Sequence, residues 1–231
     1  MIEFYNRDCL EAIKEYPDKH FDLAIVDPPY NANDAIGLKD CAQSLQKAKR
    51  RNYHLFENTA PSPEYFEQLF RVSKNQIIWG ANYFGLKGGY ICWDKKQSLF
   101  GRAELAYCSK IMSVNVFEYT WNGFIQENMS DKEARIHPTQ KPIALYKWLL
   151  SNYAEQGDLI LDTHVGSASS LIACYALGFN AVGFEIDPVY YKEAKARLED
   201  YKKQVTIFEL LEDNSADKQC TLFNLDEGAG R

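Results

Sequence analysis

The feature that most constrains the fold is a strand–helix–strand sequence over residues 159–187. An apolar run at 159–162 leads through a turn into a helical segment at 169–178, and a second apolar run follows at 181–187. Such a unit requires two parallel strands joined by a helical crossover. The alternation recurs along the chain, which predicts an α/β fold with a mostly parallel sheet and helices on both faces. Further strands are predicted at 22–27, 76–80, 89–94 and 103–109, and further helices at 61–73, 141–154 and 190–200.

The turn in this unit favours a nucleoside ligand that carries no phosphate. Asp162 ends the first strand, and Glu185 follows near the end of the second, close to the spacing of ~20 residues at which an acid reaches a ribose hydroxyl pair. A dinucleotide fingerprint needs three glycines, whereas here Gly166 is followed by Ser167 and Ala168. S-Adenosylmethionine has no pyrophosphate, so this turn favours it over NAD. The alternative is an ordinary unit of this kind with acids at its strand ends for solubility.

A second motif, DPPY at residues 27–30, ends the predicted strand 22–27. A proline fixes its own φ and holds the preceding residue extended, so the chain leaving the strand is predicted to be stiff. The Asp27 carboxylate and the Pro28 carbonyl then remain as acceptors, which suits an exocyclic amino group with its two protons. Tyr30 is expected to stack on a flat heterocycle, a contact worth ~1–3 kcal/mol per base. These residues predict a site for an amino-bearing nucleobase taken out of its stack.

Three motifs together carry a resemblance to a known family. DPPY at 27–30, HPTQKP at 137–142 and LDTHVGSASS followed by GFEID resemble the motifs of DNA amino-methyltransferases of the adenine-N6 type. Their order, with the catalytic motif first and the cofactor motif last, is that of the beta class, and the match extends over most of residues 1–200. The resemblance implies a Rossmann-like fold dependent on S-adenosylmethionine, and site-specific methyl transfer to the N6 amino group of adenine in double-stranded DNA. It also implies a homodimer as an expectation.

The resemblance gives a role to individual residues of these motifs. The catalytic motif that holds the target base would be Asp27, Pro28, Pro29 and Tyr30. The residues expected to bind the cofactor are Asp8, His137, Thr139, Gln140, Lys141, Asp162, Thr163, Gly166, Ser167, Glu185 and Ile186. Within this set Glu185 would bind the ribose and Asp8 the adenine, and residues 137–141 would lie near the methionine end.

The chain departs from the family in the cofactor turn. The family commonly has D-P-F-x-G-S-G-T-T, whereas this chain has Thr163, His164, Ala168, Ser169 and Ser170. His164 is therefore expected either to contact the ligand or to pack within the turn. Alternative functions that share the pocket chemistry are cytosine-N4 DNA methylation, whose members more often have serine in place of the motif's aspartate, and methylation of RNA or of a protein amide. An alternative from another class is a DNA-binding subunit that has lost turnover.

Composition argues against several other classes. No apolar run approaches the ~20 residues that a membrane span needs, and the histidines His20, His54, His137 and His164 have no metal-ligand spacing. We therefore expect neither a membrane protein nor a metal site. The six cysteines form no C-x-x-C pair and the N-terminus lacks the pattern of a signal peptide. We expect reduced thiols and a cytoplasmic protein, of a bacterium or of a phage that acts in a bacterial host.

Two long segments, 31–60 and 110–136, interrupt the alternation. Connections in compact domains are usually ~2–6 residues, so long ones tend to be functional. We expect both to be insertions that recognise the DNA target. The stretch 41–56 has four basic residues, no acid and interleaved aromatics, which suits phosphates and stacked bases. A solvated loop face is the alternative for this stretch.

The chain ends in an acidic segment. We expect residues 1–211 to form a single methyltransferase domain and 212–231 a flexible tail, which carries part of the formal net charge of −6. Within the tail QCTLF, at Gln219 to Phe223, resembles the pentapeptide by which bacterial replication proteins bind the sliding clamp. The clamp is thus a candidate partner, and a chance match in a flexible end is the alternative.

Overall fold

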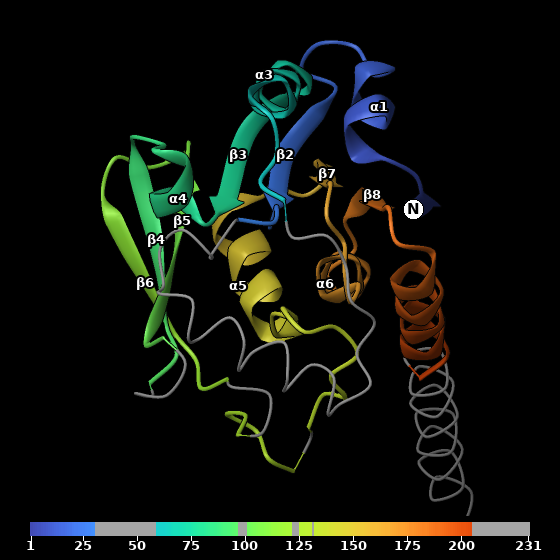
Figure 1. Cartoon of the computed structure of the whole chain (residues 1–231). Helices are drawn as coiled ribbons and strands as arrows, with labels where there is room; N and C mark the ends of the chain where they lie inside the picture. Colours follow the sequence, from blue (N-terminus) through green and yellow to red (C-terminus); the bar gives the residue numbers. More distant parts are fainter. Residues whose placement is uncertain (31–58, 97–100, 122–124, 131, 205–231) are drawn as a thin grey trace, which may run out of the picture.

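The computed structural model describes residues 1–30, 59–96, 101–121, 125–130 and 132–204. In these residues eight strands form one sheet in the order β1-β8-β7-β2-β3-β5-β4-β6 (Figure 1). Neighbouring strands are parallel except for β5, which runs antiparallel to β3 and β4. The strands are β1 (Ile2–Asn6), β2 (Phe21–Val26), β3 (Ser73–Trp79), β4 (Gly89–Asp94), β5 (Ala103–Cys108), β6 (Val114–Glu118), β7 (Leu159–Asp162) and β8 (Asn180–Glu185). The predicted mostly parallel sheet is confirmed.

Helices cover both faces of this sheet, as the sequence predicts. Asp8 caps α1 by accepting the backbone N–H of Glu11 at 3.0 Å, and Ser62 caps α3 in the same way at Tyr65. Both caps satisfy an amide that has no partner within the helix. The helices are α1 (Cys9–Lys14), α3 (Pro63–Val72), α4 (Ala81–Phe84), α5 (Ile143–Tyr153), α6 (Ser169–Ala176) and a helix over residues 188–204.

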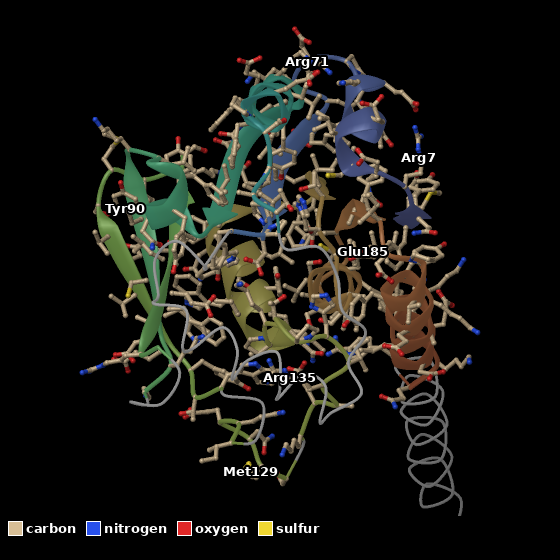
Figure 2. The ribbon with its side chains drawn as sticks, in the orientation of Figure 1. Arg7, Arg71, Tyr90, Met129, Arg135 and Glu185 are labelled. Carbon is tan, nitrogen blue, oxygen red and sulfur yellow. The ribbon has the colours of Figure 1, made fainter. Side chains whose placement is uncertain are left out.

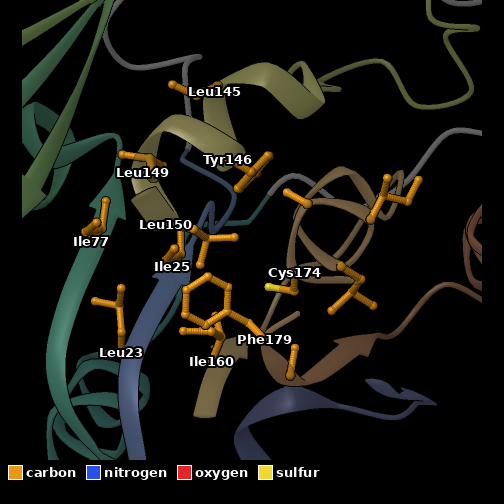
Figure 3. Close-up of a cluster of buried hydrophobic side chains, with 14 of the residues drawn as sticks. Leu23, Ile25, Ile77, Leu145, Tyr146, Leu149, Leu150, Ile160, Cys174 and Phe179 are labelled. Carbon is orange, nitrogen blue, oxygen red and sulfur yellow. The ribbon is translucent and has the colours of Figure 1, made fainter. Parts of the chain in front are cut away.

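Two hydrophobic clusters lie on opposite faces of the sheet. Leu23 and Ile25 of β2 and Ile77 of β3 point toward α5 and α6 (Figure 3). The alternate residues Ala24 and Val26 pack with α1 and α3 on the other face. Because both faces are covered, the central strands are continuous apolar runs, which made them easy to predict.

This topology brings distant segments to one edge. The central strands β2, β3, β7 and β8 are parallel, so their carboxyl ends meet at the same edge of the sheet (Figure 1). The chain turns to one side after β7 and to the other after β2, which makes the β7–β2 boundary a topological switch point. Ligands of open α/β sheets bind at such a point. Residues 27–30 follow β2 and residues 163–168 follow β7, so two of the predicted motifs lie there.

Several elements were not predicted. The strand β1 and the helix α1 are short and partly exposed, so neither gives a strong periodic pattern. The expectation that 110–136 is an insertion needs a correction, because β6 lies inside it and pairs parallel with β4. Recognition by this segment stays a prediction. Most of the segment 31–60, the basic stretch 41–56, the tail 212–231 and the motif at 219–223 lie outside the described residues.

Three findings bear on the composition. Cys9, Cys92, Cys108 and Cys174 are free thiols. No described helix combines the length and apolar character needed to cross a membrane. Within the described ranges, no three histidine, cysteine or carboxylate side chains are grouped so that they could hold a metal ion.

Candidate active site

A cavity of about 760 Å³ lies at the carboxyl ends of the central strands. Its volume is within the ~300–1,000 Å³ typical of small-molecule sites. All but one of the predicted site residues line it: Asp8, Asp27, Pro28, Pro29, Tyr30, His137, Thr139, Gln140, Lys141, Thr163, Gly166, Ser167, Glu185 and Ile186. Three motifs that are far apart in the sequence thus surround one space. The roles of the individual residues stay predictions.

Asp162 is the exception, and its predicted place in the cofactor pocket needs a correction. The residue is 2 % exposed and is absent from the cavity wall. Its Oδ1 accepts the backbone N–H of His164 at 2.9 Å, and its Oδ2 accepts the hydroxyl of Ser170. Burial raises the pKa of Asp162 to about 7. Asp162 therefore stabilises the turn after β7, because both of its oxygens accept hydrogen bonds from residues of that turn or of the helix that follows.

Glu185 lies at the end of β8, where the cavity begins (Figure 2). Its Oε2 accepts the backbone N–H of Gly166 and its Oε1 that of Asp187, both at 2.9 Å. Burial raises the pKa of Glu185, and these two donors oppose the shift. Each carboxylate oxygen keeps a further lone pair, so a carboxylate fixed in this way can still accept the hydroxyls of a ribose.

Thr163 and His164, which depart from the family pattern, form a series of polar contacts with Tyr65 and Cys9. The Tyr65 hydroxyl lies 2.6 Å from Thr163 Oγ1, which lies 2.9 Å from His164 Nδ1. His164 Nε2 lies 3.9 Å from the Cys9 sulfur. Burial lowers the pKa of His164 to about 4, so its ring is neutral at pH 7. His164 packs within the turn and also lines the cavity, and its contact with the ligand stays a prediction.

The HPTQKP segment is tied by its own side chains. His137 Nδ1 lies 3.0 Å from Thr139 Oγ1, and the ring meets Tyr190 edge to face at 4.3 Å. Burial and then the nearby Arg135 lower the pKa of His137 to about 4. The Gln140 amide accepts the backbone N–H of residue 136 and donates to the carbonyl of residue 134. Gln140 therefore shapes the segment, although it also borders the cavity.

Lys141 lines the cavity and contacts the DPPY motif, and its predicted place near the methionine end of the cofactor stays a prediction. Its Nζ donates to Asp27 Oδ2 at 2.5 Å and lies 3.1 Å from Glu104 Oε2. Burial raises the pKa of Asp27, and the Lys141 ammonium opposes this shift. Asp27 Oδ1 is buried and has no hydrogen-bond partner among the described residues. Asp27 Oδ2 is thus hydrogen-bonded to Lys141, and Asp27 Oδ1 has no partner among the described residues.

Glu104 was missed by the sequence reasoning. It lies in the strand AELAYC, where a single acid stands among apolar residues, and this contrast was the available signal. It borders a smaller cavity of about 260 Å³ that Tyr30 also lines. Charged side chains are rarely buried unless they are paired. The acid in a core strand therefore indicated a partner, which the fold identifies as lysine.

Tyr30 is held by two residues that were also not predicted. Its ring stacks on Tyr83 with centroids 4.5 Å apart and an interplanar angle of 9°. A Cβ on Gly80, which has a φ of +75°, would lie only 2.6 Å from Tyr30 Cδ1. The ring therefore rests directly on the backbone after β3, where only glycine leaves room.

The chemistry of this arrangement follows from its acceptors. Asp27 and Pro28 line a cavity that the turn after β7 and the Glu185 carboxylate also line, and Asp27 Oδ1 is an acceptor without a partner among the described residues. Two neighbouring acceptors suit the two protons of an amino group. The geometry can thus hold an amino-bearing ring next to a nucleoside ligand.

Comparisons with known proteins agree with this geometry. Residues 95–196 match the DNA methylase family N6_N4_Mtase. The chain is 25% identical to the type II methyltransferase M.HpaI of Haemophilus parainfluenzae, over 83% of this chain and 72% of that protein.

Two solved structures share the fold. One is TTHA0409 of Thermus thermophilus, a putative DNA modification methylase complexed with S-adenosyl-L-methionine, with a TM-score of 0.54, 15% identity and coverage of 87% of this chain and 96% of that one. The other is the cytosine-N4-specific PvuII DNA methyltransferase, with a TM-score of 0.57, 12% identity and coverage of 88% and 92%. The chain is therefore similar to DNA methylases of the N6/N4 type over residues 95–196, and it shares the Rossmann-like fold of these two methyltransferase structures.

Proposed function

We propose that this protein transfers a methyl group from S-adenosylmethionine to the N6 amino group of adenine in double-stranded DNA, at a specific site. The observation that carries the proposal is the Asp27 carboxylate. It is buried at the cavity wall, one oxygen is held by Lys141, and the other has no partner among the described residues. An unpaired buried acceptor is costly, so its persistence supports a partner that arrives with the substrate.

The cofactor fits the other side of the cavity. Glu185 would supply acceptors for the ribose, and a nucleoside would lie against the turn at Gly166 and Ser167, which line the same cavity. Asp8 and Ile186 border the same end, where the adenine is expected. When bound, S-adenosylmethionine supplies an activated methyl group. No metal ligand set is needed for such a transfer, because the donor is already activated.

The residues of the DPPY motif would prepare the acceptor. An exocyclic amino nitrogen is a poor nucleophile because its lone pair is delocalised into the ring. Hydrogen bonds from its two protons to Asp27 Oδ1 and to the Pro28 carbonyl would localise that pair. Asp27 is then also placed to accept the proton that the nitrogen loses. The ring of Tyr30 would stack on the base, and positioning of this kind supplies much of the rate.

The substrate must leave its stack to reach this site. The amino group of a paired base is buried in the duplex, so the base would be flipped at a cost of a few kcal/mol. We assign recognition of the sequence to the segments 31–60 and 110–136. A homodimer, and the sliding clamp as a partner of residues 219–223, remain proposals that rest on resemblance alone.

The second candidate is cytosine-N4 methylation in DNA. The PvuII enzyme with this specificity has the same fold, and cytosine also presents an amino group to two acceptors. The preference for adenine rests on the aspartate at the first position of the motif, where the resemblance associates serine with cytosine. The base therefore has to be identified chemically.

The test is expression in a methylation-deficient bacterium, followed by sequencing of genomic DNA with detection of modified bases. We expect N6-methyladenine within one short sequence. Asp27→Asn keeps the shape of the side chain but removes its charge, and we expect cofactor binding to persist while turnover falls on the order of 10²–10⁴-fold. The matched control is Asp18→Asn, which changes a carboxylate that is 76% exposed and is not among the residues that line the cavity.

Each result of these measurements points to a different conclusion about the function. N4-Methylcytosine in the genomic DNA would replace the proposal by the second candidate. No modified base, together with weak binding of S-adenosylmethionine in calorimetry, would favour a DNA-binding subunit without turnover. Near-normal turnover of Asp27→Asn would remove Asp27 from the mechanism.

A further inference from the structure

A row of four alternating charges runs away from the candidate active site. Lys141 Nζ lies 2.5 Å from Asp27 Oδ2 and 3.1 Å from Glu104 Oε2, and Lys95 Nζ pairs with Glu104 Oε1. The four side chains are 4% (Lys141), 13% (Asp27), 13% (Lys95) and 24% (Glu104) exposed. Two carboxylates and two ammonium groups balance, so the row is electrically neutral.

Each of the two lysines in the row lies over the ring of a buried tryptophan. Lys141 Nζ lies 5.3 Å from the ring centroid of Trp79, and Lys95 Nζ lies 4.8 Å from that of Trp93. The two indoles meet edge to face at 6.3 Å and are fully buried. Aromatic faces attract cations, but they cannot replace the hydration that a buried charge loses. Each charge in the row therefore depends on its neighbours.

Glu104 affects which oxygen of Asp27 is occupied. An ammonium with a single carboxylate partner can lie between both oxygens and cover them. Here the Lys141 ammonium also lies 3.1 Å from Glu104 Oε2, and its hydrogen bond to Asp27 goes to Oδ2. Oδ1 is the oxygen without a partner among the described residues.

We propose that Glu104 is a positioning residue, which attracts the Lys141 ammonium and so leaves Asp27 Oδ1 without a partner until the amino group of the substrate arrives, and that Lys95 holds Glu104 through its other oxygen. This inference rests on the proposed function. It adds two residues, from β5 and from the end of β4, that lie outside the three sequence motifs. They reach the reaction only through Lys141.

The charge balance also sets how readily Asp27 takes a proton. Burial raises the pKa of Glu104, but Lys141 and Lys95 outweigh this effect and lower it to about 2, so Glu104 is ionised at working pH. The other ionisable groups that act on Asp27 are Lys141, Lys95 and Asp162, together with the hydroxyls of Tyr30, Tyr65 and Tyr146. Burial raises the pKa of all three tyrosines, so they are neutral and the two lysines and Glu104 dominate.

Removing the charge of Glu104 and removing that of Lys95 should therefore shift the pKa of Asp27 in opposite directions. Glu104→Gln leaves two cations against one carboxylate, so the pKa of Asp27 should fall, by about one pH unit. Lys95→Gln leaves an excess of negative charge, so the pKa of Asp27 should rise. Glu104→Asp keeps the charge and should restore most of the wild-type behaviour. A purely structural role of Glu104 and Lys95 predicts none of these shifts in the pKa of Asp27.

The experiment combines two measurements on the full-length protein. The first is a ¹³C NMR titration of the Asp27 carboxyl, assigned with Asp27→Asn. The second is the rate of methyl transfer from labelled S-adenosylmethionine to unmethylated bacterial DNA as a function of pH, with cofactor affinity measured by calorimetry. The matched control is Glu118→Gln, which breaks a surface ion pair with Lys96.

We expect Glu104→Gln to bind S-adenosylmethionine within about twofold of wild type. We expect its methyl transfer to be slower on the order of 10- to 100-fold, with the acid limb of its pH profile moved to lower pH. An unchanged Asp27 titration and a rate equal to that of Glu118→Gln would overturn the inference. A wild-type protein that forms no methylated base would remove the proposed function, and the NMR titration would still decide whether Glu104 controls Asp27.

Discussion

Replacing Asp162 by asparagine tests whether a protonated carboxyl holds the turn between β7 and α6. Asp162 is 2 % exposed, and its two oxygens accept from the His164 N–H and the Ser170 hydroxyl. Burial raises its pKa to about 7, and the two donors oppose this shift. An asparagine can keep both contacts, because its oxygen accepts from His164 and its amide N–H donates to Ser170. The substitution removes the charge and little else.

The sign and size of the effect follow from the two pKa values. An aspartate in an unfolded chain has a pKa of ~3.9, so the folded state binds the proton more tightly. The stabilisation from Asp162 is complete below pH ~4 and is lost as the pH rises through about 7. Each pKa unit corresponds to 1.36 kcal/mol, so roughly 4 kcal/mol of unfolding free energy is lost across the whole window. Between pH 5 and pH 8 about 3 kcal/mol should be lost.

The assay is urea unfolding of wild type and Asp162→Asn at pH 5, 6, 7 and 8. Other carboxylates titrate in both proteins, so only the difference in unfolding free energy is interpreted. We expect this difference to move by about 3 kcal/mol in favour of the asparagine variant as the pH rises. The matched control, Asp200→Asn, changes a carboxylate that is 69% exposed on the helix over 188–204. A difference that stays constant with pH for Asp162→Asn would refute the reasoning.

Two further predictions concern residues that the sequence motifs do not include. Gly80→Ala and Gly85→Ala both place alanine at positive φ, at a cost of roughly 1–2 kcal/mol, but only the first brings a Cβ within 2.6 Å of Tyr30. Methyl transfer should therefore fall only in Gly80→Ala, and equal rates in the two variants would contradict the contact. Arg197→Met should cost about 3 kcal/mol in urea unfolding, because it removes a partly buried ion pair with Glu133, 2.7 Å from the guanidinium, and two hydrogen bonds to the turn after β7 and the start of α6. Adding Glu133→Gln should recover part of this loss, and strictly additive costs would argue against coupling.

The placement of Lys141 changes how the HPTQKP motif is understood. The sequence suggested a residue of the cofactor site, whereas the side chain reaches Asp27 of the DPPY motif. The two motifs are separated by more than a hundred residues, and only the parallel sheet brings them together. Lys141 therefore links the HPTQKP motif to the DPPY motif at the wall of the cavity.

The sequence predicted the parts of this protein that local patterns encode. Central strands such as 22–27 are continuous apolar runs because both faces of the sheet are covered, and the helix 141–154 begins with a proline that needs no donor. The edge strands β1 and β6 were missed because they are short and partly exposed, so no strong pattern marks them. The motifs DPPY, HPTQKP and the turn at 163–167 were visible because their chemistry depends on residue type and spacing.

Only the tertiary structure decided which charges meet. Whether Asp27, Glu104 and Lys141 touch depends on three segments that are adjacent in space and distant in sequence, and no local pattern contains that information. The same holds for Asp162, which lies at a strand end like Glu185 but points beneath the loop instead of into the cavity. Burial raises the pKa of Asp162 and the neighbouring lysines lower that of Glu104, and both burial and these neighbours are properties of packing.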